Sequence, residues 1–396
     1  MITKFDSLYA GHVDMDNVGY GGTPVNDRSF SDEYLATAFD KAQAIAQTMD
    51  RCGYDTMWMA EHHFQPEGYE CIPNLLMLNV HLAHLTKSLK FGCGFNIAPM
   101  WNPLRLAEDF ATADILTRGR VIFGVGRGYH TREVETFGSP LQDQAANRDL
   151  FEEQVELILK SFNERSFSHQ GKYYTIPPRV PYRGYELEEI TLVPRPRTLP
   201  VETWQPIQSA TPRALDFMAK HGIKGMLGGG VSEGGAIYDV IAAYRDALVR
   251  AGRDDAQLGE DLVIGFHFFM ADTQEAAIKE AAKYYEENLK MFGPLRLVRS
   301  LTDDQIEAMG DPSRAPTAGL PTIERAVERQ GFLCGPPELI IEQLKELEEQ
   351  YPGLERVGMS HPVGTPEKII LEQLEWLARD VMPAFTSKAE QAVPAD

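Results

Sequence analysis

The sequence is short of cysteine, of positive charge and of long apolar runs. Its four cysteines among 396 residues are far apart and form no CxxC pair, so neither a disulfide framework nor a structural zinc site is expected. The chain has 38 lysines and arginines but 58 aspartates and glutamates, and the net charge of −20 argues against nucleic acid and anionic membranes as partners. No stretch has the length of a membrane span and the first residues form no signal-peptide core, so we expect a cytoplasmic protein.

What the chain does contain is ordinary for a folded protein. Hydrophobic residues make up 43% and charged residues 24%, which excludes general disorder and allows a sizeable core. Short apolar runs alternate with helical patterns along most of the length. Eight runs are predicted to be strands: Lys4–Ala10, Asp55–Ala60, Leu89–Ile97, Arg120–Val125, Pro206–Ala210, Ile223–Leu227, Leu262–Met270 and Leu354–Ser360. Helices are predicted between and after them, at Asp32–Arg51, Asn74–Leu85, Leu104–Leu116, Phe151–Phe162 and Glu367–Val381.

Eight strand–helix units predict one α/β domain over residues 1–396 with the (β/α)₈ TIM-barrel fold, an open doubly wound sheet being the alternative. Two proline-rich segments, about 163–203 and 293–333, interrupt the alternation. We expect them at the C-terminal face of the strands, where the second segment and the glycine-rich stretch 228–235 would form lids. For the first segment, surface decoration is an equally good interpretation.

Two histidines follow the second predicted strand directly, in the sequence Glu61-His62-His63-Phe64. Successive side chains of a strand point to opposite faces, so the two histidines are not expected to share one metal ion. HExxH is absent as well, and no metal is expected. One histidine should face the mouth of the barrel, where it can act as a base or hydrogen-bond donor. The alternative is that both satisfy polar groups at the strand end.

Two further loops offer groups for an anion. Gly124-Val125-Gly126-Arg127-Gly128 follows the fourth strand, and its small residues let a ligand approach beside one arginine. Position 129 is tyrosine, so the dinucleotide pattern GxGxxG is not completed. The second loop, Gln208–Arg213, precedes a helix and carries hydroxyls and free backbone N–H groups. An ordinary helix cap by Ser209 or Thr211 explains the same residues.

Taken together, these segments resemble the bacterial luciferase-like flavin monooxygenases. The resemblance covers most of the chain in the family's order, although each segment alone would be a weak signal. The matching stretches are YDTMWMAEHHF (54–64), FGCGFNIAPMWNPLRLAED (91–109), LTRGRVIFGVGRG (116–128), Phe137-Gly138, CGPPE (334–338) and DVMP (380–383).

The resemblance implies a TIM barrel that binds reduced FMN (FMNH₂) at the C-terminal mouth of the strands. The cofactor phosphate would be held by residues of three loops: Arg127, Gly128, Tyr129, Arg148, Gln208, Ser209, Ala210 and Pro212. His62 matches the family's catalytic histidine, with Glu61 beside it. Gly94-Phe95 matches a non-proline cis peptide under the flavin ring, and Asn96 would make a polar contact with that ring.

Three positions depart from the family pattern. Gln208 stands where the family has a glutamate, which removes a negative charge beside the phosphate. Gly126 stands at the place of luciferase's reactive cysteine, so light emission is not expected. Phe95 replaces a small residue and should reshape the cavity between flavin and substrate.

The implied function is that of a two-component monooxygenase. A separate flavin reductase would supply FMNH₂, and O₂ would add at the flavin C4a to give a peroxyflavin that oxidises a small organic substrate. The family also suggests a homodimer. Further pocket residues are expected from their strand-end positions alone: His12, Met100, Trp101, Tyr129 and His130.

Three other functions were weighed. An F420-dependent hydride-transfer enzyme would use the same barrel, but its polyanionic cofactor tail is disfavoured by the acidic chain. A non-catalytic flavin-binding protein would not need His62 beside Arg127. A metal-dependent hydrolase would need an HxH pair on the first strand, and that strand reads Leu8-Tyr9-Ala10-Gly11-His12.

Overall fold

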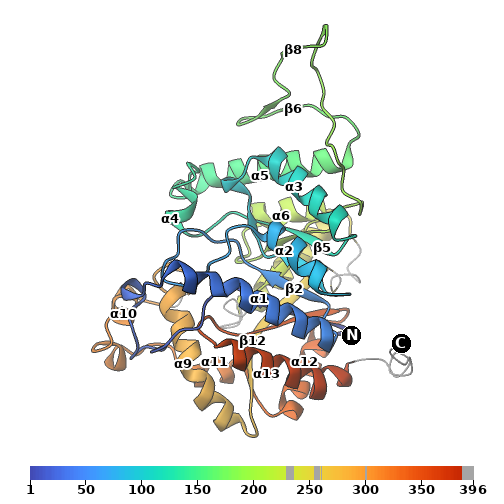
Figure 1. Cartoon of the computed structure of the whole chain (residues 1–396). Coiled ribbons are helices and arrows are strands. Elements are labelled where there is room, and N and C mark those ends of the chain that lie inside the picture. The colour runs from blue at the N-terminus through green and yellow to red at the C-terminus, as the bar shows by residue number, and fades with distance from the viewer. Residues whose placement is uncertain (229–235, 254–258, 260, 299–300, 386–396) are drawn as a thin grey trace.

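Eight parallel strands close on themselves in the computed structural model, which describes residues 1–228, 236–253, 259, 261–298 and 301–385 (Figure 1). Around the barrel they follow the order β10-β11-β12-β14-β1-β2-β3-β5, and β5 pairs with β10 to complete the ring. Their bounds are β1 Lys4–Tyr9, β2 Thr56–Met59, β3 Lys90–Cys93, β5 Val121–Gly126, β10 Thr203–Pro206, β11 Lys224–Leu227, β12 Leu262–Met270 and β14 Arg356–Ser360. The predicted TIM barrel is confirmed.

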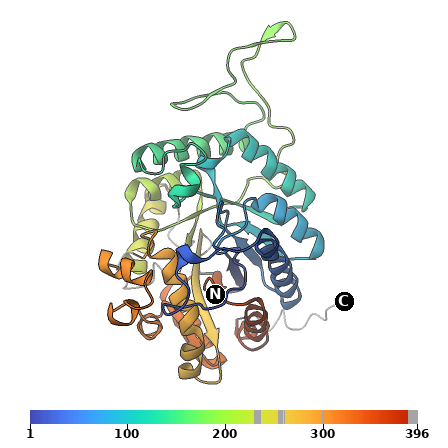
Figure 2. The same ribbon diagram turned by 60° about the vertical axis from the view of Figure 1, so that its left-hand side comes forward.

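Helices surround the barrel, and Figure 2 shows the ring that they form. Those of eight or more residues are α1 Asp32–Cys52, α2 Leu75–Leu85, α3 Pro103–Leu116, α5 Gln144–Asn163, α6 Pro212–His221, α8 Ala236–Arg250, α9 Gln274–Phe292, α12 Pro337–Gln350 and α13 Glu367–Asp380. The sequence explains the bounds of α1 well. The Ser31 side chain caps its first turn, Gly53 ends it with a φ of 79°, and the alanine-rich face predicted for it is buried.

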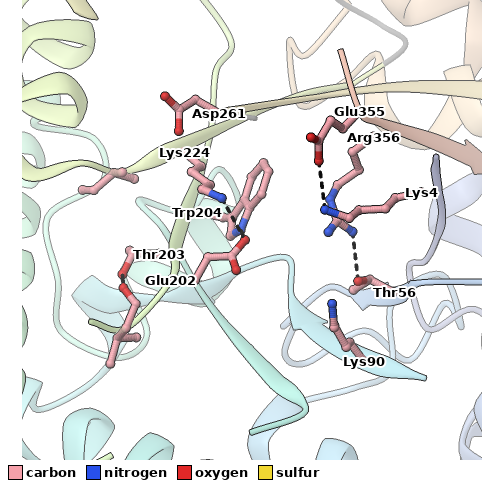
Figure 3. Close-up of polar contacts among 12 residues, drawn as sticks. Lys4, Thr56, Lys90, Glu202, Thr203, Trp204, Lys224, Asp261, Glu355 and Arg356 are labelled. Carbon is pink, nitrogen blue, oxygen red and sulfur yellow. Dashed lines mark hydrogen bonds and ion pairs between the residues drawn. The ribbon is translucent and has the colours of Figure 1, made fainter. Parts of the chain in front are cut away.

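The end of the barrel where the strands begin is closed by paired charges (Figure 3). Arg356 binds Asp6 and Asp55 at 2.7 Å each, and the indole of Trp58 donates to Asp6 at 2.9 Å. Above these charges, Trp58 and Trp204 meet edge to face with ring centroids 5.7 Å apart. Paired charges and indole rings fill this end of the barrel. A ligand would therefore enter at the opposite end, the C-terminal mouth.

Close packing inside the barrel demands glycine at one strand position. A Cβ on Gly92 would lie 2.1 Å from the ring of Trp58, so any larger residue would displace that indole. The sequence therefore places its largest interior side chain and its smallest one at the same level of neighbouring strands.

Two strand predictions need correction. The strand predicted at Pro206–Ala210 is wrong: β10 ends at Pro206, because Thr203 and Trp204 are buried and pair with β5, whereas Gln208 and Ala210 are exposed. The run Leu89–Ile97 is two strands, β3 and the short β4 (Asn96–Ile97), separated by a cis peptide bond between Gly94 and Phe95.

The placement predicted for the first insertion is also wrong. Residues 163–203 connect the end of α5 to the start of β10, and a helix that follows a strand returns the chain to the strand starts. Near the end of the insertion, the backbone N–H of Thr198 donates to Asp114 in the last turns of α3. Near its beginning, three successive backbone N–H groups donate to Glu153 on the outer side of α5. The insertion therefore lies away from the mouth.

This insertion contains two small antiparallel hairpins. They are formed by β6 His169–Gln170 with β7 Thr175–Ile176 and by β8 Pro181–Tyr182 with β9 Tyr185–Glu186. The second hairpin is the tip of an arm that projects from the body in both views (Figures 1 and 2).

The second insertion lies on the mouth side, as expected, but it is less irregular than its prolines suggest. It contains α10 Asp303–Met309, the 3₁₀ turn Ala315–Thr317, α11 Ile323–Glu328 and the start of β13 Phe332–Gly335. These elements share a buried apolar cluster with α9. At the end of α9, Phe292 meets the ring of Tyr129 at the mouth, with centroids 6.4 Å apart. Most of the other predicted lid, 229–235, falls outside the described residues.

Four short helical elements of the described residues remain. They are α4 Thr131–Val134 and the 3₁₀ turns Val25–Asp27, Ala98–Met100 and, after α13, Met382–Ala384. No helix in the described ranges combines the length and apolarity needed to cross a bilayer.

Candidate active site

His62 is held at the mouth between two buried carboxylates. It follows β2, and its Nδ1 lies 3.1 Å from the Glu133 carboxylate of α4. Its Nε2 lies 3.1 Å from Glu70 Oε1 and 2.9 Å from the Tyr129 hydroxyl. The same hydroxyl donates to Glu70 at 2.9 Å. Each ring nitrogen of His62 therefore has a carboxylate oxygen as a neighbour.

Two further side chains complete this group, which we call the proton network (His62, Gln65, Glu70, Tyr129, His130 and Glu133). His130 Nε2 lies 3.0 Å from Glu70 Oε2, the oxygen that His62 does not use. The Gln65 amide donates to Glu70 at 3.1 Å and to Glu133 at 2.9 Å. Apart from Tyr129, which is half-buried, the members of the network are buried.

The geometry favours the imidazolium form of His62. Carboxylates only accept hydrogen bonds, so a carboxylate beside both nitrogens is satisfied when both carry protons. Burial by itself would lower the pKa of His62, but Glu70 and Glu133 outweigh it and hold that pKa above its ordinary value. Burial would likewise raise the pKa of Glu133, yet the bond from His62 keeps it below the ordinary range. The network thus favours a proton on both nitrogens of His62.

His62, Glu70 and His130 also present nitrogen and oxygen atoms within 4.8 Å of one another, as a metal site would. The two histidines, however, approach different oxygens of Glu70 at hydrogen-bond distances. Hydrogen bonds are enough to explain this arrangement, since each of these contacts pairs a possible donor with an acceptor.

Glu61 and His63 point to a different set of partners, as strand alternation predicts. Glu61 accepts hydrogen bonds from the backbone N–H of Ile97 at 3.0 Å and from the Trp101 indole at 2.8 Å. His63 Nε2 lies 3.2 Å from Glu61 Oε1, the oxygen that also accepts from the Trp101 indole. Glu61, predicted beside the catalytic histidine, is therefore bound within the wall of the mouth and is separate from the proton network.

Three arginines gather beside the mouth: Arg127 directly after β5, Arg148 in α5 and Arg213 in α6. Arg127 donates to the Asn147 side chain at 2.8 Å and to Gln144 at 3.0 Å, and both partners are uncharged. Burial, together with the nearby charges of Arg148 and Arg213, lowers the pKa of Arg127 to about 10. Among the described residues, Arg127 thus forms its hydrogen bonds with neutral groups, and two other positive charges lie near it. An anion bound here would therefore be stabilised.

The start of α6 lies in the same region. Thr211 precedes the helix without a side-chain cap, and its hydroxyl lies 2.9 Å from that of Ser209. Pro212 occupies the first turn, and the preceding Gln208 and Ala210 are exposed. Arg213 reaches back to Asp149 and Glu152 on α5, which brings this loop next to Arg148. The loops predicted to hold a phosphate therefore converge, except that the Tyr129 hydroxyl lies in the proton network.

The Gly94–Phe95 peptide is cis, as the family pattern implied. Asn96, directly after it, is buried, and its amide donates to the carbonyl of Gly124 at 2.9 Å. Its Oδ1 atom has no hydrogen-bond partner among the described residues. Gly128 follows Arg127 with a φ of 82°, where a Cβ would lie 2.5 Å from Val134.

The remaining predicted pocket residues lie in several different environments. His130 belongs to the proton network, and Trp101 to the wall beside Glu61. Met100 packs against a small apolar cluster with Ile97. His12 is buried, with Nε2 3.0 Å from the carbonyl of Thr365.

Three residues of the network were missed by the sequence analysis. Gln65 and Glu70 lie in an irregular loop, and Glu133 lies in a four-residue helix, so no periodic pattern marked them. The signal available was the dense acidic and histidine content just after β2 and β5.

Comparison with known proteins places this site in context. The family model "luciferase-like monooxygenase" matches residues 20–352. The oxygenase component of a flavin-dependent trigonelline monooxygenase from Acinetobacter baylyi is 24% identical over 357 residues, which cover 88% of this chain and 90% of that protein. Other curated relatives match shorter stretches, and for some of them the chain spans only 35 or 36% of their length.

Two of the solved structures that share the fold are compared with the chain below. The oxygenating constituent of 3,6-diketocamphane monooxygenase from Pseudomonas putida, in complex with FMN, has a TM-score of 0.68 at 21% identity and covers 97% of this chain and 99% of that one. An F420-dependent secondary alcohol dehydrogenase has a TM-score of 0.63 at 16% identity and covers 98% of this chain and 100% of that one. The barrel therefore does not by itself choose between the two cofactors, but the family match spans well over half of the sequence. The chain belongs to the luciferase-like monooxygenase family.

Proposed function

We propose that the protein is the oxygenase of a two-component system that uses reduced FMN and O₂ to oxidise a small organic substrate. The observation that carries the proposal is the arginine cluster of Arg127, Arg148 and Arg213 beside the proton network at one mouth. The first group suits one terminal phosphate, and the second can hold and move a proton where oxygen is reduced.

The residues at the mouth fit this cofactor. Arg127 and Arg148 would bind the phosphate, with the Ser209 hydroxyl and the N-terminal N–H groups of α6 beside them. Asn96, whose buried Oδ1 lacks a partner, would accept a hydrogen bond from the flavin ring. When bound, reduced FMN supplies the electrons with which one oxygen atom of O₂ enters the substrate and the other leaves as water.

The chain itself would contribute charge, protons and exclusion of water. Glu70 and Glu133 raise the pKa of His62, so its imidazolium form would provide a positive charge and a proton beside the reacting atoms. The Tyr129 hydroxyl bonds both His62 and Glu70, so it would relay that proton from the buried network to the mouth. Phe292 and Phe95 would keep water from the reacting groups.

The same proposal includes a separate flavin reductase as the source of FMNH₂, a homodimeric assembly and a cytoplasmic location. A name among the relatives, the oxygenase component of trigonelline monooxygenase, supports the division of labour between two proteins.

Cofactor choice is tested by anaerobic titration of the protein with reduced FMN, reduced riboflavin and reduced F420. We expect reduced FMN to bind tightest, because the arginine cluster matches one phosphate. Turnover is then tested with a flavin reductase, NADH, FMN and ¹⁸O₂ against a panel of small aldehydes, ketones and thioethers. One ¹⁸O atom in a product supports the proposal, whereas preferential F420 binding with oxygen-independent substrate reduction would overturn it.

A further inference from the structure

A second buried cluster of charges lies near the end of α9 that reaches the mouth, and the proton network does not include it. Its centre is Glu287, whose side chain is completely buried. Arg28 lies 3.1 Å from one carboxylate oxygen, and Lys290 lies 2.8 Å from the other. Each oxygen has a further donor, the Tyr69 hydroxyl at 2.5 Å and the backbone N–H of Gly19 at 2.7 Å. We call these five residues the Glu287 cluster.

The Glu287 cluster joins α9 to the loop between β1 and α1. Arg28 donates to the carbonyls of Asp16 and Asn17 at 3.0 and 2.9 Å. Lys290 donates to the carbonyl of Gly19 at 2.8 Å. In Figure 1 this blue segment lies beside α9. The two cations thus hold the main chain of the β1–α1 loop against the helix.

The loop after β2 that carries Glu70 is tied to the same β1–α1 loop by its backbone. The N–H of Val13 donates to the carbonyl of Gly68 at 2.9 Å, and the N–H of Cys71 donates to that of Gly11 at 3.0 Å. Gly68 has a φ of 80°, and a Cβ there would lie 2.7 Å from the Val13 side chain. The main chain on both sides of Glu70 is therefore closely fitted to the β1–α1 loop.

Within the loop after β2, Tyr69 is the side chain that enters the Glu287 cluster. It is buried, and Arg28 lies 6.0 Å from the centroid of its ring. Burial and the charge of Glu287 raise the pKa of Tyr69 above its ordinary value, so the phenol keeps its proton and donates a hydrogen bond to that carboxylate. The next residue is Glu70, which contributes most among the groups that raise the pKa of His62.

We propose that Glu287, acting through the Tyr69 hydroxyl, is a positioning residue that sets where the Glu70 carboxylate lies beside His62. The proposal rests on the proposed function, in which His62 supplies a proton. A hydrogen bond to a charged group is roughly twice as strong as one between neutral groups, and this one fixes the side chain next to Glu70. Because α9 leads into the second insertion, the same contact ties that insertion to the proton network.

The choice of variant follows from the charges of the cluster. Glu287→Gln would leave Arg28 and Lys290 buried without a carboxylate, and such a loss can prevent folding. Tyr69→Phe is therefore the main variant, because it removes one hydroxyl and leaves both ion pairs of Glu287 in place. Glu70→Gln serves as the reference, since it removes the charge that Tyr69 is proposed to position.

Tyr54→Phe is the matched control for the loss of a buried tyrosine hydroxyl. Tyr54 is buried, and its hydroxyl donates to the carbonyl of Leu374 at 2.9 Å, outside the Glu287 cluster. Urea unfolding compares the stability of all variants with that of the wild type. A purely structural role of Tyr69 would lower stability, as the control does, without a local effect at His62.

Two local measurements on the full chain test the proposal. NMR titration of ¹³C-labelled histidine gives the pKa of His62, and hydrogen exchange gives the opening rate of the Cys71 amide, which is bonded to Gly11. We expect Tyr69→Phe to lower the pKa of His62, in the same direction as Glu70→Gln but less far. The Cys71 amide should exchange roughly 10-fold faster or more, the effect of losing one hydrogen bond to a charged group.

Tyr54→Phe should change neither reading, even if its unfolding midpoint falls as far as that of Tyr69→Phe. An unchanged pKa of His62 in folded Tyr69→Phe would overturn the proposal. Equal changes at His62 in the control would overturn it as well, because they would show a general loosening of the fold. These readings do not depend on turnover or on flavin, so they are distinct from a failure of the proposed function.

Discussion

Replacing Glu133 by glutamine tests whether the proton network sets the charge of His62. The carboxylate lies 3.1 Å from His62 Nδ1, and Glu133→Gln keeps the shape while removing the charge. An opposite charge at such a distance raises the pKa of a histidine by about 1–3 units, or about 1.4–4 kcal/mol. In the variant, the burial that already acts to lower the pKa of His62 is opposed only by Glu70 and, more weakly, by Glu61. We therefore expect that pKa to fall by about 1–3 units.

The assay is NMR titration of the chain with ¹³C-labelled histidine, with the His62 signal assigned from a His62→Gln variant. The pH profile of product formation should lose its high-pH side at a correspondingly lower pH. Glu67→Gln is the matched control, because Glu67 lies in the same loop but binds Arg132, at 2.8 Å. An unchanged pKa in Glu133→Gln, or an equal fall in Glu67→Gln, would refute the reasoning.

Three other predictions follow from the same geometry. Arg127→Ala should weaken the binding of reduced FMN by about 1.5–3 kcal/mol and that of reduced riboflavin much less, as measured by anaerobic titration. Equal losses for both flavins would show that the arginine has a structural role instead. Burial lowers the pKa of His267 to about 4 and of His361 to about 3, so both stay neutral in the folded chain while the unfolded chain protonates them below about pH 6.5. Each of these two histidines should therefore lower the free energy of unfolding by about 1.4 kcal/mol per pH unit as the pH falls from 6.5 towards its own pKa in the folded chain. Urea unfolding should show a flatter pH dependence for His361→Phe than for the wild type, and parallel curves would contradict this. Dialysis against EDTA should leave flavin-dependent product formation unchanged, because hydrogen bonds account for the His62–Glu70–His130 group, and a loss restored by a divalent cation would show a metal site instead.

Local order made parts of the site predictable from the sequence. Side-chain alternation at the end of β2 separates His62 from His63, and the two do turn to Glu133 and to Glu61 respectively. Glycine on both sides of Arg127 marks a backbone that bends at the mouth, and Gly128 has a positive φ there. These features depend on neighbours in the chain, so a single sequence can show them.

Features that depend on contacts between residues far apart in the chain could not be predicted from the sequence. Glu133 meets His62 only because β2 and β5 bring their C-terminal loops together across the mouth, 71 residues apart in the chain. The raised pKa of His62 follows from that meeting, which outweighs the burial of the ring, and no local pattern reports either.

The amino-acid sequence by itself determined the barrel, through eight apolar runs separated by helical patterns, because strand and helix periodicities are local properties. It also determined which strand ends carry the histidine and the arginine. Tertiary structure alone decided which carboxylates face His62, where β10 ends, and that residues 163–203 leave the body at the strand starts. Those outcomes depend on the closure of the ring between β5 and β10, since closure fixes which loops share a mouth and which face away from it.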